Sequence, residues 1–164
     1  MEAYYYQQMS RHKQVAYHAM KAGFTALSPG FSVPRLENRE LSDIFFQLRL
    51  DCPEIFYVTG FTYRFAPGAE NVELLPEYLF DKAKIKDHQK ALAARVEKLT
   101  RPAKNMTALE KERYIHDFIC QNVRYDKLKK PYSHEIIGPL GQGVGVCEGI
   151  AKSVKILCDA LGLW

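Results

Sequence analysis

Apolar residues recur along most of the chain at intervals of three and four positions, the spacing that places them on one face of a helix. Turn-forming residues interrupt this pattern at positions 28–30, and Pro53 and Pro102 each end a periodic stretch. A capping-box sequence from Thr107 to Glu110 opens a further stretch. The pattern therefore predicts helices over residues 2–27, 41–50 and 81–100, and another from residue 107 onward.

Two stretches are rich in the β-branched and aromatic residues that favour strands, residues 55–65 and, more weakly, 72–80. The breaker run Ala-Pro-Gly at positions 66–68 separates them, which predicts a β-hairpin. A short extended piece at 31–36 can pair with this hairpin as a further strand.

Residues 127–145 carry three glycines near their end and are predicted to form a loop. The expected fold class is α+β, mainly helical with a small antiparallel β element. We place a boundary in the segment around Pro102, between an N-terminal α/β region (1–102) and a second region (103–164).

The last predicted helix begins at or near Cys147, directly after the run Gly-Val-Gly-Val that starts at Gly143. Backbone N–H groups at the start of a helix lack intrahelical acceptors, and together with the helix dipole they favour a thiolate over a thiol. This position predicts a nucleophile at Cys147. The alternative is a small apolar cysteine that packs where the loop meets the helix. One helix face is apolar and the other is polar: Ile150, Ala151, Val154, Leu157, Cys158 and Leu161 against Lys152, Ser153, Lys155 and Asp159.

Several short motifs near this cysteine resemble the transglutaminase-like superfamily, papain-type enzymes whose nucleophilic Cys begins a helix packed on a β-sheet. The motifs are residues 114–119 (Tyr-Ile-His-Asp-Phe-Ile), 123–126 (Val-Arg-Tyr-Asp), Gly138 and 145–149 (Gly-Val-Cys-Glu-Gly). The usual run in the family is Gly-x-Cys-x-Gly-Tyr-Ala. This chain matches it except at Ile150, where the Tyr is expected. A weaker likeness over about 41–60, around the run Asp-Cys-Pro-Glu-Ile-Phe-Tyr that starts at Asp51, is to a segment ahead of the core in bacterial members.

The resemblance implies that Cys147 is the catalytic residue and that a His and an Asp follow it on strands further along the chain. No His lies beyond His134, so the resemblance implies a chain that ends inside the catalytic domain, with 103–164 as the N-terminal half of the core. The other interpretation is a family member that has lost its base. The implied function is that of part of a cysteine enzyme acting on peptide or glutamine amide bonds through a thioester, nearly inactive in this form. The alternative is a non-catalytic module that binds protein or peptide with a degenerate version of this fold.

Other candidate groups lie before the cysteine. Gln142 could donate to an oxyanion, as a Gln upstream of the Cys does in papain-like proteases, or be an exposed loop amide. His134 and His116 could act as bases, although His116 suits a structural place in its helix. The glycines at 141, 143 and 145 could hold a phosphate, but the preceding residues make a poor strand for such a motif. The pair Tyr125-Asp126 resembles one that stands just before a variable loop in the family, and it is expected to hold the end of the preceding helix.

Charge and cysteine content exclude several other classes of protein. The net charge of +4 is spread along the chain, which does not indicate a nucleic-acid partner. No apolar run approaches the roughly 18 residues of a membrane span, and no secretory signal is visible, so we expect a cytoplasmic protein. The four cysteines form no C-x-x-C pair, so neither a metal nor a cofactor is expected.

The expected partners are a protein or peptide substrate and whatever covers the apolar side of the Cys147 helix. That side would favour self-association, or docking of the missing C-terminal half. It is formed by Ile150, Val154, Leu157, Leu161 and Trp164.

Overall fold

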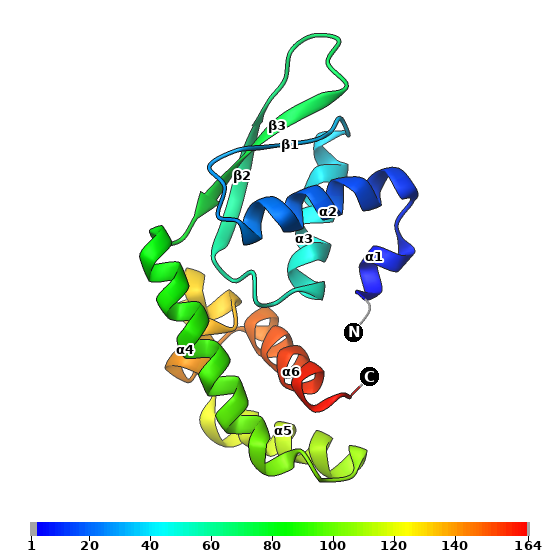
Figure 1. Ribbon diagram of the computed structural model, residues 1–164. Coiled ribbons are helices and arrows are strands. Elements are labelled where there is room, and N and C mark those ends of the chain that lie inside the picture. Colours follow the sequence, from blue (N-terminus) through cyan, green and yellow to red (C-terminus); the bar gives the residue numbers. More distant parts are fainter. Residues whose placement is uncertain (1–2, 164) are drawn as a thin grey trace. The chain divides into compact units, whose positions relative to one another are not determined.

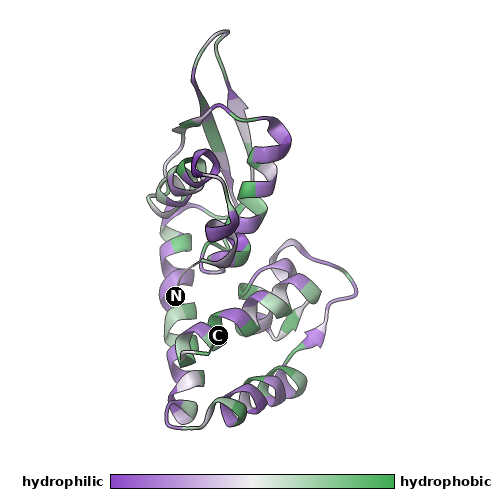
Figure 2. Cartoon of the chain, turned by 90° about the vertical axis from the view of Figure 1, so that its right-hand side faces the viewer, coloured by the Kyte–Doolittle hydropathy of each residue, from purple (hydrophilic) through white to green (hydrophobic). Residues whose placement is uncertain are grey.

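The computed structural model describes residues 3–163, which divide into two compact units, one up to Lys82 and one from Ala83 (Figure 1). The division lies at the start of the long helix α4, whereas the boundary set from the sequence lay after residue 102. Helices make up most of the regular structure in both units, and the three-stranded sheet in unit 1 is antiparallel. These features confirm the α+β class. The helices carry both polar and apolar residues, as the amphipathic spacing predicts (Figure 2).

Unit 1 packs helices against a three-stranded sheet in the order β1-β3-β2. Its elements are α1 (Tyr4–Gln8), α2 (Arg11–Thr25), β1 (Phe31–Pro34), α3 (Asn38–Asp51), β2 (Val58–Arg64) and β3 (Asn71–Tyr78). The predicted hairpin is confirmed as β2 and β3, and the extended piece pairs with β3 through Val33 opposite Val72. The chief contacts of α2 are with β1 and α3.

The predicted single helix over 2–27 is wrong, because the chain is extended at Met9 and Ser10 between α1 and α2. The break has a cause on another helix. The two carboxylate oxygens of Asp51 accept hydrogen bonds from the backbone N–H groups of Tyr5 and Tyr6, each at 3.1 Å. Asp51 therefore supplies acceptors for the start of a separate short helix.

The core of unit 1 is aromatic and places a cysteine at the end of α3. Phe45 meets Phe24 and Phe61 edge-on, with ring centroids 5.7 and 5.4 Å apart. Cys52 is the C-cap of α3 and is only 4% exposed. Burial raises the pKa of the Cys52 thiol, and burial likewise raises the pKa of the nearby Tyr17 hydroxyl.

Unit 2 contains the predicted helices α4 and α5 and the helix that begins at Cys147. Its elements are α4 (Lys82–Thr100), η1 (Arg101–Ala103), α5 (Ala108–Asn122), β4 (Arg124–Tyr125), η2 (Pro131–His134), η3 (Ile137–Gln142), β5 (Val144–Gly145) and α6 (Cys147–Leu161). The capping box is confirmed: Thr107 N–H donates to Glu110 Oε2 at 2.8 Å, and Glu110 N–H donates to Thr107 Oγ1 at 3.4 Å. Among the residues the structure describes, no helix is both long and apolar enough to cross a bilayer.

The segment 127–145, predicted as a loop, contains two helical turns, η2 and η3, and the strand β5, which runs parallel to β4. The backbone N–H of Asp126 donates to the Gly145 carbonyl at 3.0 Å. The Asp126 carboxylate accepts from the N–H groups of Leu128 and Lys130 and from the Ser133 hydroxyl. These bonds, the Ser133 hydroxyl first, lower the pKa of Asp126. The Asp126 carboxylate thus binds the residues after it, and the expectation that the pair holds the preceding helix end is wrong for Asp126.

Candidate active site

Cys147 is the first residue of α6 and its side chain is exposed. Val146 precedes it in an extended conformation, and the Val146 N–H donates to the carbonyl of Ser133 at 3.0 Å. The first turn of α6 is thereby joined to η2, although the two lie more than a dozen residues apart in sequence. A thiol at this position faces solvent beside N–H groups that have no intrahelical acceptor.

Gly149 explains how closely η2 approaches the helix. A Cβ at this position would lie 2.2 Å from the carbonyl oxygen of Ser133 and 3.2 Å from the backbone nitrogen of Glu135. No side chain fits without moving one backbone away from the other. The second glycine of the Gly-x-Cys-x-Gly run therefore permits this crossing two residues after the cysteine.

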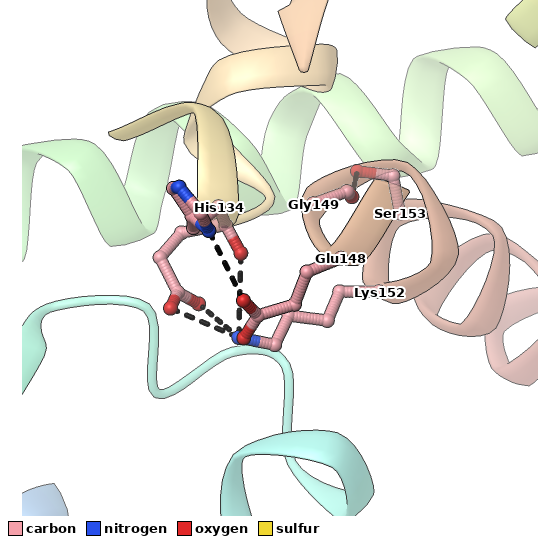
Figure 3. Close-up of polar contacts among 6 residues, drawn as sticks. His134, Glu148, Gly149, Lys152 and Ser153 are labelled. Carbon is pink, nitrogen blue, oxygen red and sulfur yellow. Dashed lines mark hydrogen bonds and ion pairs between the residues drawn. The ribbon is translucent and has the colours of Figure 1, made fainter. Parts of the chain in front are cut away.

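A buried lysine, Lys152, lies on the same side of α6 as Gly149, about one turn further along the helix (Figure 3). Lys152 is 2% exposed, and its ammonium group contacts both Glu135 oxygens at 2.9 and 3.0 Å. It also donates to Glu148 Oε1 at 2.7 Å and to the carbonyl of His134 at 3.3 Å. The cation therefore joins α6 to the end of η2 through charge-assisted hydrogen bonds.

We call Lys152 and the residues that bind it, Glu135, Glu148 and His134, the Lys152 cluster. His134 lies within this cluster but is not hydrogen-bonded to Cys147. Its Nδ1 is 3.2 Å from Glu148 Oε2, and its side chain is 40% exposed. In the part of the chain that the structure describes, no hydrogen bond joins Cys147 Sγ to a histidine. The carboxylate of the residue after Cys147 therefore holds His134, and the contact expected of a base is absent from these residues.

The other proposed base, His116, lies on the exposed surface of α5. Its Nδ1 is 3.0 Å from Asp117 Oδ1 and its Nε2 is 3.5 Å from the Sγ of Cys120, one turn away. His116 thus contacts a different thiol, and Cys120 is exposed as well. Any measurement of thiol reactivity in this protein has to separate Cys120 from Cys147.

Gln142 lines a groove of about 560 Å³ formed by α4, α5 and η3, together with Arg95 and Phe118. Cys147 does not line that groove, so the structure does not bring Gln142 and the thiol together there. The segment before β5 is the helical turn η3, which does not suit a strand-to-helix phosphate loop. No group of three or more metal-ligating side chains is found between residues 3 and 163.

The apolar side of α6 is only partly open. Leu157 and Leu161 are 2% and 6% exposed, so the prediction that this whole side lacks a partner is wrong for these two residues. Ile150 and Val154 are half-buried and line a groove of about 310 Å³ between α5 and α6. Trp164, the remaining member of that predicted face, lies outside the described residues.

The residues that the sequence did not reveal are on the opposite side of α6. Lys152 and Ser153 were assigned to a polar face, yet they are 2% and 0% exposed. The spacing of Glu148 and Lys152 was a usable signal, since residues four apart meet on a helix. Nothing in the local pattern pointed to Glu135 as the second carboxylate.

One comparison with known proteins agrees with the resemblance seen in the sequence. The family model described as the transglutaminase-like superfamily matches residues 91–163, from within α4 to just beyond the end of α6. The matched region contains Cys147 and the whole Lys152 cluster. No curated protein matches the chain. Residues 91–163 are therefore similar to the transglutaminase-like superfamily.

Proposed function

We propose that Cys147 is the nucleophile of a cysteine enzyme that acts on peptide or glutamine amide bonds. The sulfur attacks the amide carbonyl, a carbon–sulfur bond forms, and the carbon–nitrogen bond breaks to give a thioester. The proton from the thiol leaves with the amine or ammonia. The observation that carries this proposal is an exposed Cys147 at the first position of α6, inside the family match.

The start of α6 also suits the charge that develops during such an attack. The carbonyl oxygen becomes an oxyanion in the transition state, and N–H groups without other acceptors stabilise it. The first N–H groups of a helix are of this kind, and those of α6 lie at the same end as the thiol.

A base is needed for fast turnover, and general-base assistance contributes about 10²–10⁴-fold to a rate. No histidine among residues 3–163 is hydrogen-bonded to Cys147. We therefore expect the 164-residue chain to be acylated by an activated ester at Cys147, and to hydrolyse amide substrates too slowly to detect.

The test is acetylation by p-nitrophenyl acetate, followed by peptide mapping in a mass spectrometer. Cys147→Ser is expected to lose the fastest acetylation, whereas the matched variant Cys120→Ser, which also removes an exposed thiol, is expected to keep it. Hydroxylamine should release the acetyl group, as it does from thioesters. Acetylation confined to Cys120, with Cys147 unmodified, would contradict the proposal.

A second candidate function is recognition of an apolar peptide segment without catalysis. The observation in its favour is the groove between α5 and α6, which Ile150 lines together with Ile115 and Ile119. Ile150 stands where the family run has Tyr, so this surface differs from the usual one. The same mapping separates the two functions, because a binding module gives Cys147 no advantage over Cys120 in acetylation.

A further inference from the structure

We propose that Lys152 is a positioning residue for Cys147, an inference that rests on the proposed function. Its ammonium group holds the first turn of α6 against the η2 segment and so sets the direction in which the thiol is presented. Lys152 does not touch the sulfur or the substrate in this role. It acts through Glu148, the residue that directly follows the cysteine.

The contacts of Lys152 join two segments that are distant in sequence (Figure 3). On α6 the ammonium group binds Glu148 at 2.7 Å, and beyond η2 it binds Glu135, from 17 positions away, at 2.9 and 3.0 Å. A further bond goes to the His134 carbonyl, 18 positions away. The Lys152 ammonium group thus binds both segments that meet here, the first turn of α6 and the end of η2.

Other contacts of the first turn converge on the same segment. Val146 N–H is bonded to the Ser133 carbonyl, and Gly149 lies against that carbonyl. The residues on both sides of Cys147 are therefore tied to η2, directly or through Lys152. Cys147 itself is exposed, so the turn is held while the sulfur stays open to a substrate.

A buried ion pair holds two segments together only while both of its charged partners are present. If the cation is removed, the Glu135 and Glu148 carboxylates lose the ammonium group that both of them bind, and loss of one partner from a buried ion pair strongly disfavours the native geometry. We expect the first turn and η2 to move apart in response. Catalytic geometry is sensitive to such shifts, since a misplacement of about 1 Å can cost about 10²-fold in rate.

Two reactions of the same thiol separate positioning from simple access. Alkylation by iodoacetamide needs an accessible thiolate. Acetylation by p-nitrophenyl acetate also gains from helix N–H groups aligned with the developing oxyanion. A positioning residue is therefore expected to affect the ratio of acetylation to alkylation at Cys147, whereas a general loss of structure changes both rates.

The variants are Lys152→Met, Lys152→Arg and, as a matched control on the same helix, Lys155→Met. Lys155 forms an ion pair with Asp159 at 2.7 Å, four residues away, as Lys152 does with Glu148. We expect Lys152→Met to lower the ratio at Cys147 about 10-fold or more, Lys152→Arg to restore part of it, and Lys155→Met to leave it unchanged. Cys120, mapped in the same samples, reports alkylation of an exposed thiol outside the cluster.

The outcomes distinguish the two proposals. A wild-type chain that is not acetylated at Cys147 overturns the proposed function itself. A wild-type chain that is acetylated, with an unchanged ratio in Lys152→Met, overturns only the positioning role. Equal falls in both rates assign Lys152 a purely structural role and overturn it too. If Lys152→Met fails to fold, Glu135→Gln removes one carboxylate charge and keeps an acceptor oxygen, and an unchanged ratio in that variant overturns the proposal.

Discussion

Two cysteines of this chain stand at opposite kinds of helix end, one in each unit. Cys52 closes α3 as its C-cap and is 4% exposed, and its sulfur lies 3.7 Å from the Tyr17 hydroxyl. Cys147 opens α6 and is exposed. The C-terminal end of a helix disfavours a negative charge and the N-terminal end favours it. The same residue type is thus buried at the C-terminal end of a helix in unit 1 and exposed at the N-terminal end of a helix in unit 2.

The polar residues beside the two cysteines bind different groups. Beside Cys52, the Asp51 carboxylate accepts a buried hydrogen bond from the Tyr17 hydroxyl and two partly buried ones from backbone N–H groups at the start of α1. Beside Cys147, the buried charges of Lys152 and Glu135 bind the backbone and side chains around the thiol and leave the thiol outside. In this chain a thiol is therefore buried or exposed according to which groups the neighbouring polar residues bind.

The largest expected effect is the difference in alkylation rate between the two thiols in the native protein. We expect iodoacetamide to modify Cys147 at least about 100-fold faster than Cys52, because a buried thiol reacts only after local opening, and about 2.7 kcal/mol of opening free energy suffices. In guanidinium chloride the two rates should become similar. Comparable rates without denaturant would remove the basis of the comparison.

The next effect concerns the stability of unit 1. Asp51→Ala leaves the Tyr17 hydroxyl and two backbone N–H groups without their acceptor, and a buried unsatisfied group costs about 1–3 kcal/mol. We expect a loss in this range in urea unfolding, accompanied by faster alkylation of Cys52. The control is Asp43→Ala, on the same helix with an exposed side chain. An equal loss in that control would show that the α3 helix, and not the cap of α1, was weakened.

A smaller effect is expected at the start of α6. Gly149→Ala places a Cβ against the Ser133 carbonyl, and overpacking of this kind costs about 1–3 kcal/mol, part of which relaxation of η2 relieves. The matched control is Gly141→Ala, whose Cβ would meet Ile137 at an ordinary 3.5 Å. We expect a lower unfolding midpoint only for Gly149→Ala. If both variants unfold with the wild type, the close crossing of η2 does not limit stability.

The sequence predicted those elements of the fold that depend on local spacing. The amphipathic helices, the capping box at Thr107 and the hairpin of β2 and β3 follow from neighbours within a few residues. The break at Met9 does not, because the acceptor that separates α1 from α2 is Asp51, 45 positions from Tyr6. Local propensity carries no information about such a partner.

The candidate site divides in the same way. The place of Cys147 at the start of α6 was predicted from the glycines before it and the apolar period after it. The burial of Lys152 was not, because a lysine on a polar helix face is usually solvated, and here the distant Glu135 adds a second carboxylate to that of Glu148. Here tertiary contacts override the binary pattern of the helix.

The parallel pairing of β4 with β5 has a consequence for how this protein can vary. Arg124 and Val144 are held side by side, so the two ends of the intervening stretch meet regardless of what its outermost residues are. Leu128, at 76% exposed, belongs to that outer part. Substitutions or insertions there can change the exposed surface of this stretch, while Cys147 keeps its position at the start of α6.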